Sequence, residues 1–224
     1  MEWFEAIILG LVQGLTEFLP VSSSGHLVIG RELLGVESSD DLVFEGVVHA
    51  ATVLSTIVVF RKTIWNLLKG LFRFKYNDET DYILKICVSM IPVFIIGMFF
   101  KDYVEGLFSS IYVVGGALLM TACLLFFSDL ASNPRRKSAA TCIAENKYRS
   151  GISYWQAFAV GLGQAFAVIP GLSRSGTTIS TGLICGVKRS AMAQFSFLMV
   201  LVPILGETFL QLVGGEMAES SIGA

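Results

Sequence analysis

One polar segment set inside an apolar stretch occurs twice in this chain and restricts the folds that the chain can adopt. The first copy is Gly10 to His26, GLVQGLTEFLPVSSSGH, and the second copy, displaced by 151 positions without a gap, is Gly161 to Thr177, GLGQAFAVIPGLSRSGT. The residues that are identical in the two copies are mainly Gly, Ser and Gln, whereas shared apolar composition would favour Leu and Val. We therefore interpret the pattern as an internal duplication.

The remainder of the chain is typical of an integral membrane protein. Only 15% of its residues are charged and its mean hydropathy is +0.68. Long apolar runs, each near the roughly 17 to 25 residues that a spanning helix needs, lie at 44–60, 82–100, 110–127 and 195–213. The net charge of -2, with basic residues gathered in loop clusters, indicates no nucleic-acid partner. We predict one integral membrane domain over residues 1–224, surrounded by membrane lipids.

Each copy of the repeated segment is predicted to form a helical hairpin. Residues 3–20 and 26–35, and likewise 154–170 and 177–187, are two apolar pieces separated by a Pro, Ser and Gly break. Such a break leaves backbone groups unpaired, and hydrocarbon tolerates that only where the break is buried in protein or lines a wet cavity. We expect two re-entrant helical hairpins.

Charge placement predicts the orientation of these hairpins. The segments 61–81, 128–153 and 188–189 hold 12 of the 16 basic residues, and basic loops of membrane proteins are usually cytoplasmic. The first hairpin then enters from the outer side and the second from the cytoplasmic side, with three spans between them. The predicted fold class is all-α, a polytopic membrane helical bundle with inverted-topology repeats: repeat 1 at about 1–130, a cytoplasmic linker at about 128–153 and repeat 2 at about 154–224.

Repeat 1 contains two spans for which repeat 2 has no counterpart. These are 82–100 and 110–127, whereas repeat 2 has only the span at 195–213 after its hairpin. We expect the natural polypeptide, or its nearest relatives, to carry two more C-terminal spans.

The first hairpin carries a carboxylate where a membrane helix seldom has one. Gln13 and Glu17 are four residues apart and therefore share a helix face. An ionisable group at membrane depth is a functional candidate by default, and the two side chains supply hard oxygen ligands for Mg²⁺ or Ca²⁺. The alternative is that Glu17 lies near the interface and is simply hydrated.

The break of the first hairpin combines hydroxyls with an imidazole. Ser22, Ser23 and Ser24 precede His26, and serine beside histidine permits nucleophilic and acid–base roles. A polar turn with one helix-capping serine is the structural alternative. It accounts for one serine well and for the whole SSSGH poorly.

The break of the second hairpin is suited to an anion. A Gly/Ser/Thr loop opens a helix there, so that backbone N–H groups and the positive helix end can receive a phosphate; the residues are Gly171, Ser173, Arg174, Ser175, Gly176, Thr177 and Thr178. The fork of donors on Arg174 fits a phosphate, and a buried guanidinium without an anion is costly. The alternative is a structural salt bridge between Arg174 and Glu17.

The segments QGLTEFLPVSSSGH and PGLSRSGTT resemble the two signature motifs of the bacterial undecaprenyl-diphosphate phosphatase family, also called the bacitracin-resistance protein family. The resemblance covers essentially the whole chain. It implies hydrolysis of undecaprenyl (polyprenyl) diphosphate to the monophosphate, recycling of the lipid carrier of cell-wall synthesis, and bacitracin resistance. It also implies a divalent cation (Mg²⁺ or Ca²⁺) and an active site that opens to the outer face of the bacterial plasma membrane.

The resemblance also implies roles for individual residues. Glu17 would help to bind metal and diphosphate, Ser23 and His26 would be the candidate nucleophile and acid–base group, and Arg174 would complete the catalytic set. The phosphates would be held by Ser22, Ser24, Ser173, Arg174, Ser175, Gly176 and Thr178. Gln13 stands where many members have Glu, so a metal site of two carboxylates becomes one of Glu17 and Gln13.

Several alternatives remain open from the sequence. Inverted repeats are equally typical of a transporter or flippase for an anionic lipid or solute, although translocation does not require His26 beside serines. Attack by Ser23 through a phosphoserine and direct attack by water are both compatible with these residues. A homodimer is a further open alternative.

Overall fold

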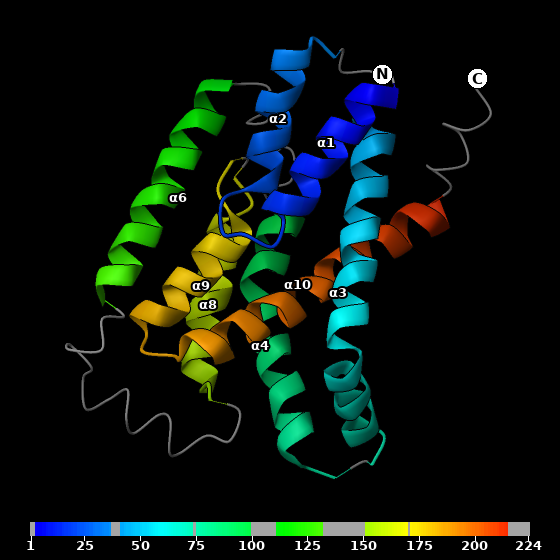
Figure 1. The fold of residues 1–224 in the computed structure, drawn as a ribbon. Coiled ribbons are helices and arrows are strands. Elements are labelled where there is room, and N and C mark those ends of the chain that lie inside the picture. The colour runs from blue at the N-terminus through cyan, green and yellow to red at the C-terminus, as the bar shows by residue number, and fades with distance from the viewer. Residues whose placement is uncertain are drawn as a thin grey trace.

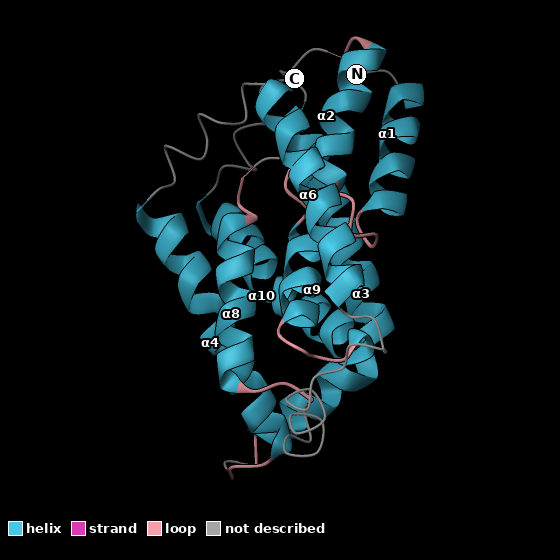
Figure 2. Ribbon diagram, turned by 90° about the vertical axis from the view of Figure 1, so that its left-hand side faces the viewer, coloured by secondary structure: helices cyan, strands magenta, loops and turns pink. Residues whose placement is uncertain are grey.

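Every secondary-structure element in the described part of the chain is an α-helix (Figures 1 and 2). The computed structural model describes residues 3–36, 41–73, 75–99, 111–131, 151–169 and 171–214, with side-chain surroundings for all of these except 41–43, 45, 111 and 204–214. In chain order the helices are α1 (Trp3–Thr16), α2 (Ser23–Leu34), α3 (Asp41–Leu71), α4 (Asp78–Phe99), α6 (Ile111–Ala131), α8 (Tyr154–Phe166), α9 (Arg174–Ile184) and α10 (Arg189–Gly214).

Three stretches of helix are long and apolar enough to cross a membrane. They are Gly46–Leu71 in α3, Asp78–Phe99 and Tyr112–Ala131. Large apolar side chains on them, such as Val58 and Phe94, are exposed, which is expected of helices that face lipid. The predicted all-α membrane helical bundle is thereby confirmed.

The predicted loop at 61–81 is largely helical, and this expectation was wrong. Helix α3 continues to Leu71 and α4 already begins at Asp78. The reason is that residues 61–71 combine good helix formers with apolar side chains at helical spacing. Arg61 and Lys62 interrupt the apolar run at Phe60, whereas the helix itself continues through them to Leu71.

Other predicted segments lie wholly or partly outside the described residues. Most of the expected linker at 128–153 lies outside the described residues. The predicted span at 195–213 falls within α10, where side chains are described as far as Pro203.

The two short helical pairs form hairpins that approach each other from opposite ends of the bundle. Helices α1 and α2 lie side by side at one end, and α8 and α9 lie lower in the same view, with the two breaks between them (Figure 1). Figure 2 shows the same arrangement from a direction turned by 90°. The orientation of either hairpin relative to a membrane stays a prediction.

The hairpins share local geometry at the spacing of the sequence repeat. The Gly25 N–H donates to the hydroxyl of Ser22 at 3.3 Å, and 151 positions later the Gly176 N–H donates to the hydroxyl of Ser173 at 3.0 Å. Each serine therefore caps the helix that follows it. These caps start α2 and α9 three residues earlier than predicted, so the serines and Arg174 lie in the first helical turn instead of in a long loop.

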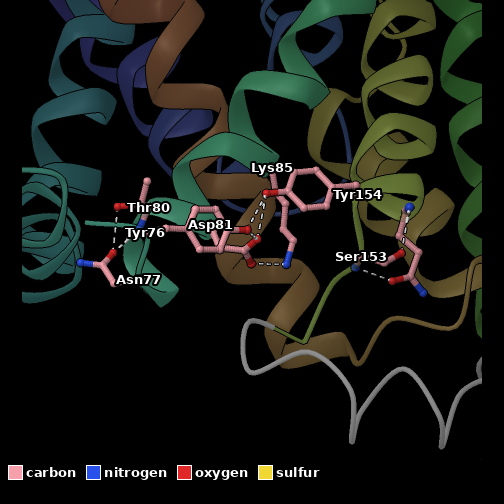
Figure 3. A network of polar contacts seen from close by, with 8 residues as sticks. Tyr76, Asn77, Thr80, Asp81, Lys85, Ser153 and Tyr154 are labelled. Atoms are coloured by element: carbon pink, nitrogen blue, oxygen red, sulfur yellow. Dashed lines mark hydrogen bonds and ion pairs between the residues drawn. The ribbon is translucent and has the colours of Figure 1, made fainter. Parts of the chain in front are cut away.

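A network around the buried Lys85 of α4 connects this helix to the first residue of the second hairpin. The Lys85 side chain is 0% exposed, and its Nζ lies 2.5 Å from Oδ2 of Asp81. The other oxygen of Asp81 accepts hydrogen bonds from the hydroxyls of Tyr76 at 2.7 Å and Tyr154 at 2.8 Å (Figure 3). Lys85 also lies beneath the Tyr154 ring, 5.2 Å from its centroid. Because Tyr154 is the first residue of α8, this network fixes the start of the hairpin.

A close helix crossing fixes the same hairpin further along. Gly161 in α8 lies against the main chain of α4, where a Cβ atom would clash with the carbonyl group of Ser89. Its repeat counterpart, Gly10 in α1, has no atom within 4 Å of the corresponding Cβ position. The two glycines thus occupy equivalent positions in the sequence repeat but have different surroundings in the structure.

We expect Gly161→Ala to destabilise the protein and Gly10→Ala to leave it unchanged or slightly more stable. The first substitution forces two backbones apart, and overpacking of this kind costs about 1–3 kcal/mol. The second only removes the roughly 0.5–1 kcal/mol penalty of glycine within a helix. Thermal unfolding in detergent measures both. Equal midpoints for the two variants would show that the α4–α8 crossing does not require glycine.

Candidate active site

The turn of the first hairpin is organised around the carboxylate of Glu17. Its Oε2 accepts a hydrogen bond from Nε2 of Gln13 at 2.9 Å and a second one from the hydroxyl of Ser23. Gln13 is only 1% exposed. Because Ser23 is the first residue of α2 and Glu17 follows the last residue of α1, one carboxylate joins the two helices and orients a serine hydroxyl.

Ser22 has the only positive φ among the described residues other than glycine, at 66°. Such a backbone conformation is strained for a residue with a side chain and is common at functional sites. Its carbonyl oxygen is 2.7 Å from Nδ1 of His26. Because a carbonyl oxygen only accepts, Nδ1 carries the hydrogen, and in the neutral ring Nε2 is left to accept a proton.

The second hairpin presents a guanidinium at the start of a helix. Arg174 is the first residue of α9, directly after the capping residue Ser173. It is half-buried, and in the described part of the chain its side chain makes no ion pair. The proposed structural salt bridge to Glu17 is therefore not formed. The positive end of α9 and an unpaired guanidinium together attract an anion.

The two hairpin breaks meet. The hydroxyl of Ser175 lies 3.4 Å from the carbonyl oxygen of Leu19 in the other hairpin. A Cβ atom on Gly176 would lie 2.9 Å from the carbonyl oxygen of Pro20, so only glycine allows the main chains to come this close. We call this contact between 17–26 and 173–178 the tip junction. It brings into contact the two breaks that carry the predicted chemical groups.

Thr178 bonds to a neighbouring helix through the hydroxyl that we predicted to contact a phosphate. It is fully buried, and its hydroxyl lies 2.7 Å from the hydroxyl of Ser196 in α10 and 2.9 Å from the carbonyl oxygen of Arg174. The predicted contact of Thr178 with a phosphate would require these bonds to change. In the geometry present, Thr178 holds α9 against α10.

Comparison with protein families agrees with this architecture. A family model described as bacitracin resistance protein BacA matches residues 6–223 of the chain. The match includes both hairpins and all the helices between them. The chain belongs to this family.

Relatives of this BacA family member are similar along nearly the whole chain. A protein from Bacteroides fragilis named undecaprenyl-diphosphatase is 54% identical over 99% of this chain and 80% of its own length. Proteins of the same name from Bacteroides thetaiotaomicron and Parabacteroides distasonis are 53% and 54% identical, over 100% of this chain and 80% and 81% of their own lengths. The resemblance noted from the two sequence motifs is confirmed.

Little in the sequence indicates the polar residues that hold the second break of this BacA family member in place. The Ser173 N–H donates to the hydroxyl of Thr121 in α6 at 3.0 Å, and further along α9 the hydroxyl of Ser180 donates to that of Ser128 at 3.1 Å. The available signal was a hydroxyl residue inside an apolar run, since hydroxyls at membrane depth usually bond between helices.

The metal that the family resemblance implies can be tested against the donor atoms present. Oε1 of Gln13 is buried without a hydrogen-bond partner, beside the carboxylate of Glu17. The described residues contain no cluster of three or more His, Cys, Asp or Glu side chains that could enclose an ion. Two hard oxygen ligands fit Mg²⁺, which keeps several waters and takes phosphate oxygens as further ligands.

Proposed function

We propose that this protein hydrolyses undecaprenyl diphosphate to undecaprenyl monophosphate and phosphate. The names of its relatives support the substrate. The tip junction supports the reaction, since it combines a serine hydroxyl hydrogen-bonded to Glu17 with the unpaired Arg174 at the start of α9. The hydroxyl bond to Glu17 is the observation on which the proposal depends most.

The second hairpin binds the diphosphate in this proposal. Arg174 offers paired N–H donors, and the first-turn N–H groups of α9 offer the positive end of the helix. The first turn of α9 is fixed before substrate arrives, because the cap and the bonds to α6 and α10 hold the break. Prepositioned charge of this kind stabilises the additional negative charge of a phosphoryl-transfer transition state.

The chemical step begins at Ser23. Its hydroxyl hydrogen is directed at Glu17, so the carboxylate accepts the proton as Oγ attacks the terminal phosphorus. The bond from that phosphorus to the bridging oxygen breaks, and its electron pair leaves with the lipid monophosphate. The product on the protein is a phosphoserine.

Release of phosphate requires a second attack, by water. The Nε2 atom of His26 is free to accept a proton, because Nδ1 donates to the Ser22 carbonyl. His26 then serves as the general base that activates the water. Attack on the phosphoserine returns Ser23 to its hydroxyl form and liberates phosphate.

Gln13 and Glu17 would hold the divalent cation. When bound, the ion would neutralise charge on the phosphates. Glu17 has a second oxygen for this purpose while Oε2 stays hydrogen-bonded to Ser23 and Gln13.

We place the protein in the bacterial plasma membrane with the site open to the outer face. The basic segments at 61–81 and 188–189 support a cytoplasmic position for the end of the bundle that carries the start of α8. In this orientation the enzyme would recycle the lipid carrier of cell-wall synthesis, which is the basis of bacitracin resistance.

The proposal is tested with purified protein in detergent and undecaprenyl diphosphate. We expect phosphate release that falls at least about tenfold in EDTA and returns with added Mg²⁺, since the ion shares the charge of the diphosphate. Lipid movement across vesicles without any phosphate release would overturn the enzyme assignment in favour of a carrier. Full activity in EDTA would remove the metal from the proposal and leave the hydrolysis.

A further inference from the structure

The two hairpins carry different chemistry at equivalent positions. With the offset of 151, Arg174 stands at the position of Ser23 and Thr177 at the position of His26, while Gln164 repeats Gln13. The nucleophile and the base are therefore confined to the first hairpin. The second hairpin keeps polar groups at the same places without either of them.

Two of these polar groups are buried in the second hairpin without a partner. The hydroxyl of Thr177 and Oε1 of Gln164 have no hydrogen-bond partner in the described part of the chain, and the residues are only 5% and 2% exposed. Buried polar groups are nearly always paired, because leaving one unpaired is destabilising. Groups that the fold leaves unpaired are candidates for pairing with a ligand.

The helical conformation does not prevent the Thr177 hydroxyl from forming a hydrogen bond. A threonine in a helix usually donates to the carbonyl oxygen four residues earlier. Thr178 and Thr181 do so within α9, at 2.9 Å and 2.7 Å. Thr177 could do the same toward Ser173, but its hydroxyl remains unpaired. Thr177 is therefore the one threonine of α9 whose hydroxyl has no hydrogen bond.

The unpaired hydroxyl of Thr177 lies one helical turn after Arg174. Thr177 is three residues after Arg174 and therefore on the same face of α9. Its methyl group approaches α8 next to Gln164, since a Cβ atom on Gly163 would lie 3.5 Å from Cγ2 of Thr177. Arg174 and Thr177 thus share one face of α9, near the tip junction, and Thr177 packs against α8 at the residue that precedes Gln164.

We propose that Thr177 and Gln164 are positioning residues that hold the phosphate remaining on the lipid, while the first hairpin acts on the terminal phosphate. This inference rests on the proposed function and deepens it. The two phosphates share one bridging oxygen, so a terminal phosphate at Ser23 directs its neighbour toward the other hairpin. There the Thr177 hydroxyl donates to a phosphate oxygen, and the amide of Gln164 can turn its NH₂ group toward another.

Thr177→Val tests the proposal, because valine keeps the shape and removes the hydroxyl. We expect the affinity for undecaprenyl monophosphate, which carries only the lipid-side phosphate, to fall about tenfold, the loss expected for one hydrogen bond to a charged group. Inhibition by inorganic phosphate, which stands for the terminal phosphate, should not change. The midpoint of thermal unfolding without ligand should stay the same or rise, because an unpaired buried hydroxyl has been removed.

Matched variants separate this role from a structural one. Thr177→Ser should restore the affinity, and Gln164→Leu should repeat the loss. Thr181→Val, one turn along the same helix, should leave the affinity unchanged, since that hydroxyl already donates to the Thr177 carbonyl oxygen.

Two results would overturn the inference, and each is distinct from failure of the proposed function. One is unchanged binding of undecaprenyl monophosphate by Thr177→Val, measured as a ligand-induced shift in the unfolding midpoint. The other is a lowered midpoint with equal loss of both ligands, which indicates a structural hydroxyl. Absence of phosphate release by the wild-type protein would instead refute the hydrolase assignment, and the binding comparison would still decide the role of Thr177.

Discussion

Arg174→Ala is expected to lower kcat/KM for undecaprenyl diphosphate by about 1000-fold, the upper range for removing one prepositioned group that stabilises transition-state charge. Arg174 is the first residue of α9 and has no ion-pair partner in the described part of the chain. Its charge is therefore available to the substrate and not used by the fold. Phosphate release by purified protein at fixed Mg²⁺ measures the loss.

Arg174→Lys is the matched control for this loss. Lysine keeps the charge but not the fork of donors, so activity should recover only in part. Because no ion pair is lost, the thermal midpoint of Arg174→Ala should stay at or above that of the wild type. A lowered midpoint in proportion to the activity loss, or activity near that of the wild type, would contradict a phosphate-binding role.

Ser23→Ala is expected to lower kcat by at least about 1000-fold, since removal of an activated nucleophile commonly has an effect of this size or larger. The Ser23 hydroxyl is the group that donates to Glu17 at the tip junction. Glu17→Gln should show a comparable loss, because the amide accepts a proton poorly. The double variant should be little worse than either single one, as is usual for residues that act as a unit.

Ser24→Ala is the control for the neighbouring hydroxyl. Its Oγ lies 3.4 Å from that of Ser22, whereas Glu17 is hydrogen-bonded to Gln13 and Ser23, so we expect a small effect on kcat. Trapping of a phosphoserine at Ser23 in acid-quenched wild-type protein would establish the covalent route directly. Full activity of Ser23→Ala would eliminate that route and leave direct attack by water.

The helices and the two hairpins followed from local patterns in the sequence. Apolar runs of spanning length, interrupted by Ser, Gly and Pro in two places, predict these elements because a helix in hydrocarbon must satisfy its own backbone. The same reasoning misplaced the end of α3 and the starts of α2 and α9. Helix ends depend on caps such as Ser22 and Ser173, and the pattern of apolar residues does not reveal which serine is the cap.

The candidate site was only partly predictable for a similar reason. Gln13, Glu17 and Ser23 could be grouped because they are close in sequence, and a carboxylate within an apolar segment stands out. Thr121 and Ser196 could not, since each lies between apolar neighbours in a long helix and gains its role from a partner more than 15 residues away along the chain. Thr178 is the opposite case, because its motif predicts a phosphate contact while in the structure its hydroxyl bonds to Ser196 and to the carbonyl oxygen of Arg174.

The sequence by itself determined that the chain is a helical membrane protein with two polar breaks, and it predicts the reactive groups at those breaks. Only the tertiary structure decided that the breaks meet, with Ser175 near Leu19 and Gly176 against Pro20. It also distinguished Gly10 from Gly161, which the repeat makes equivalent. The physical reason is range: helix formation depends on neighbours within a few residues, whereas the approach of two backbones depends on how whole helices pack against each other.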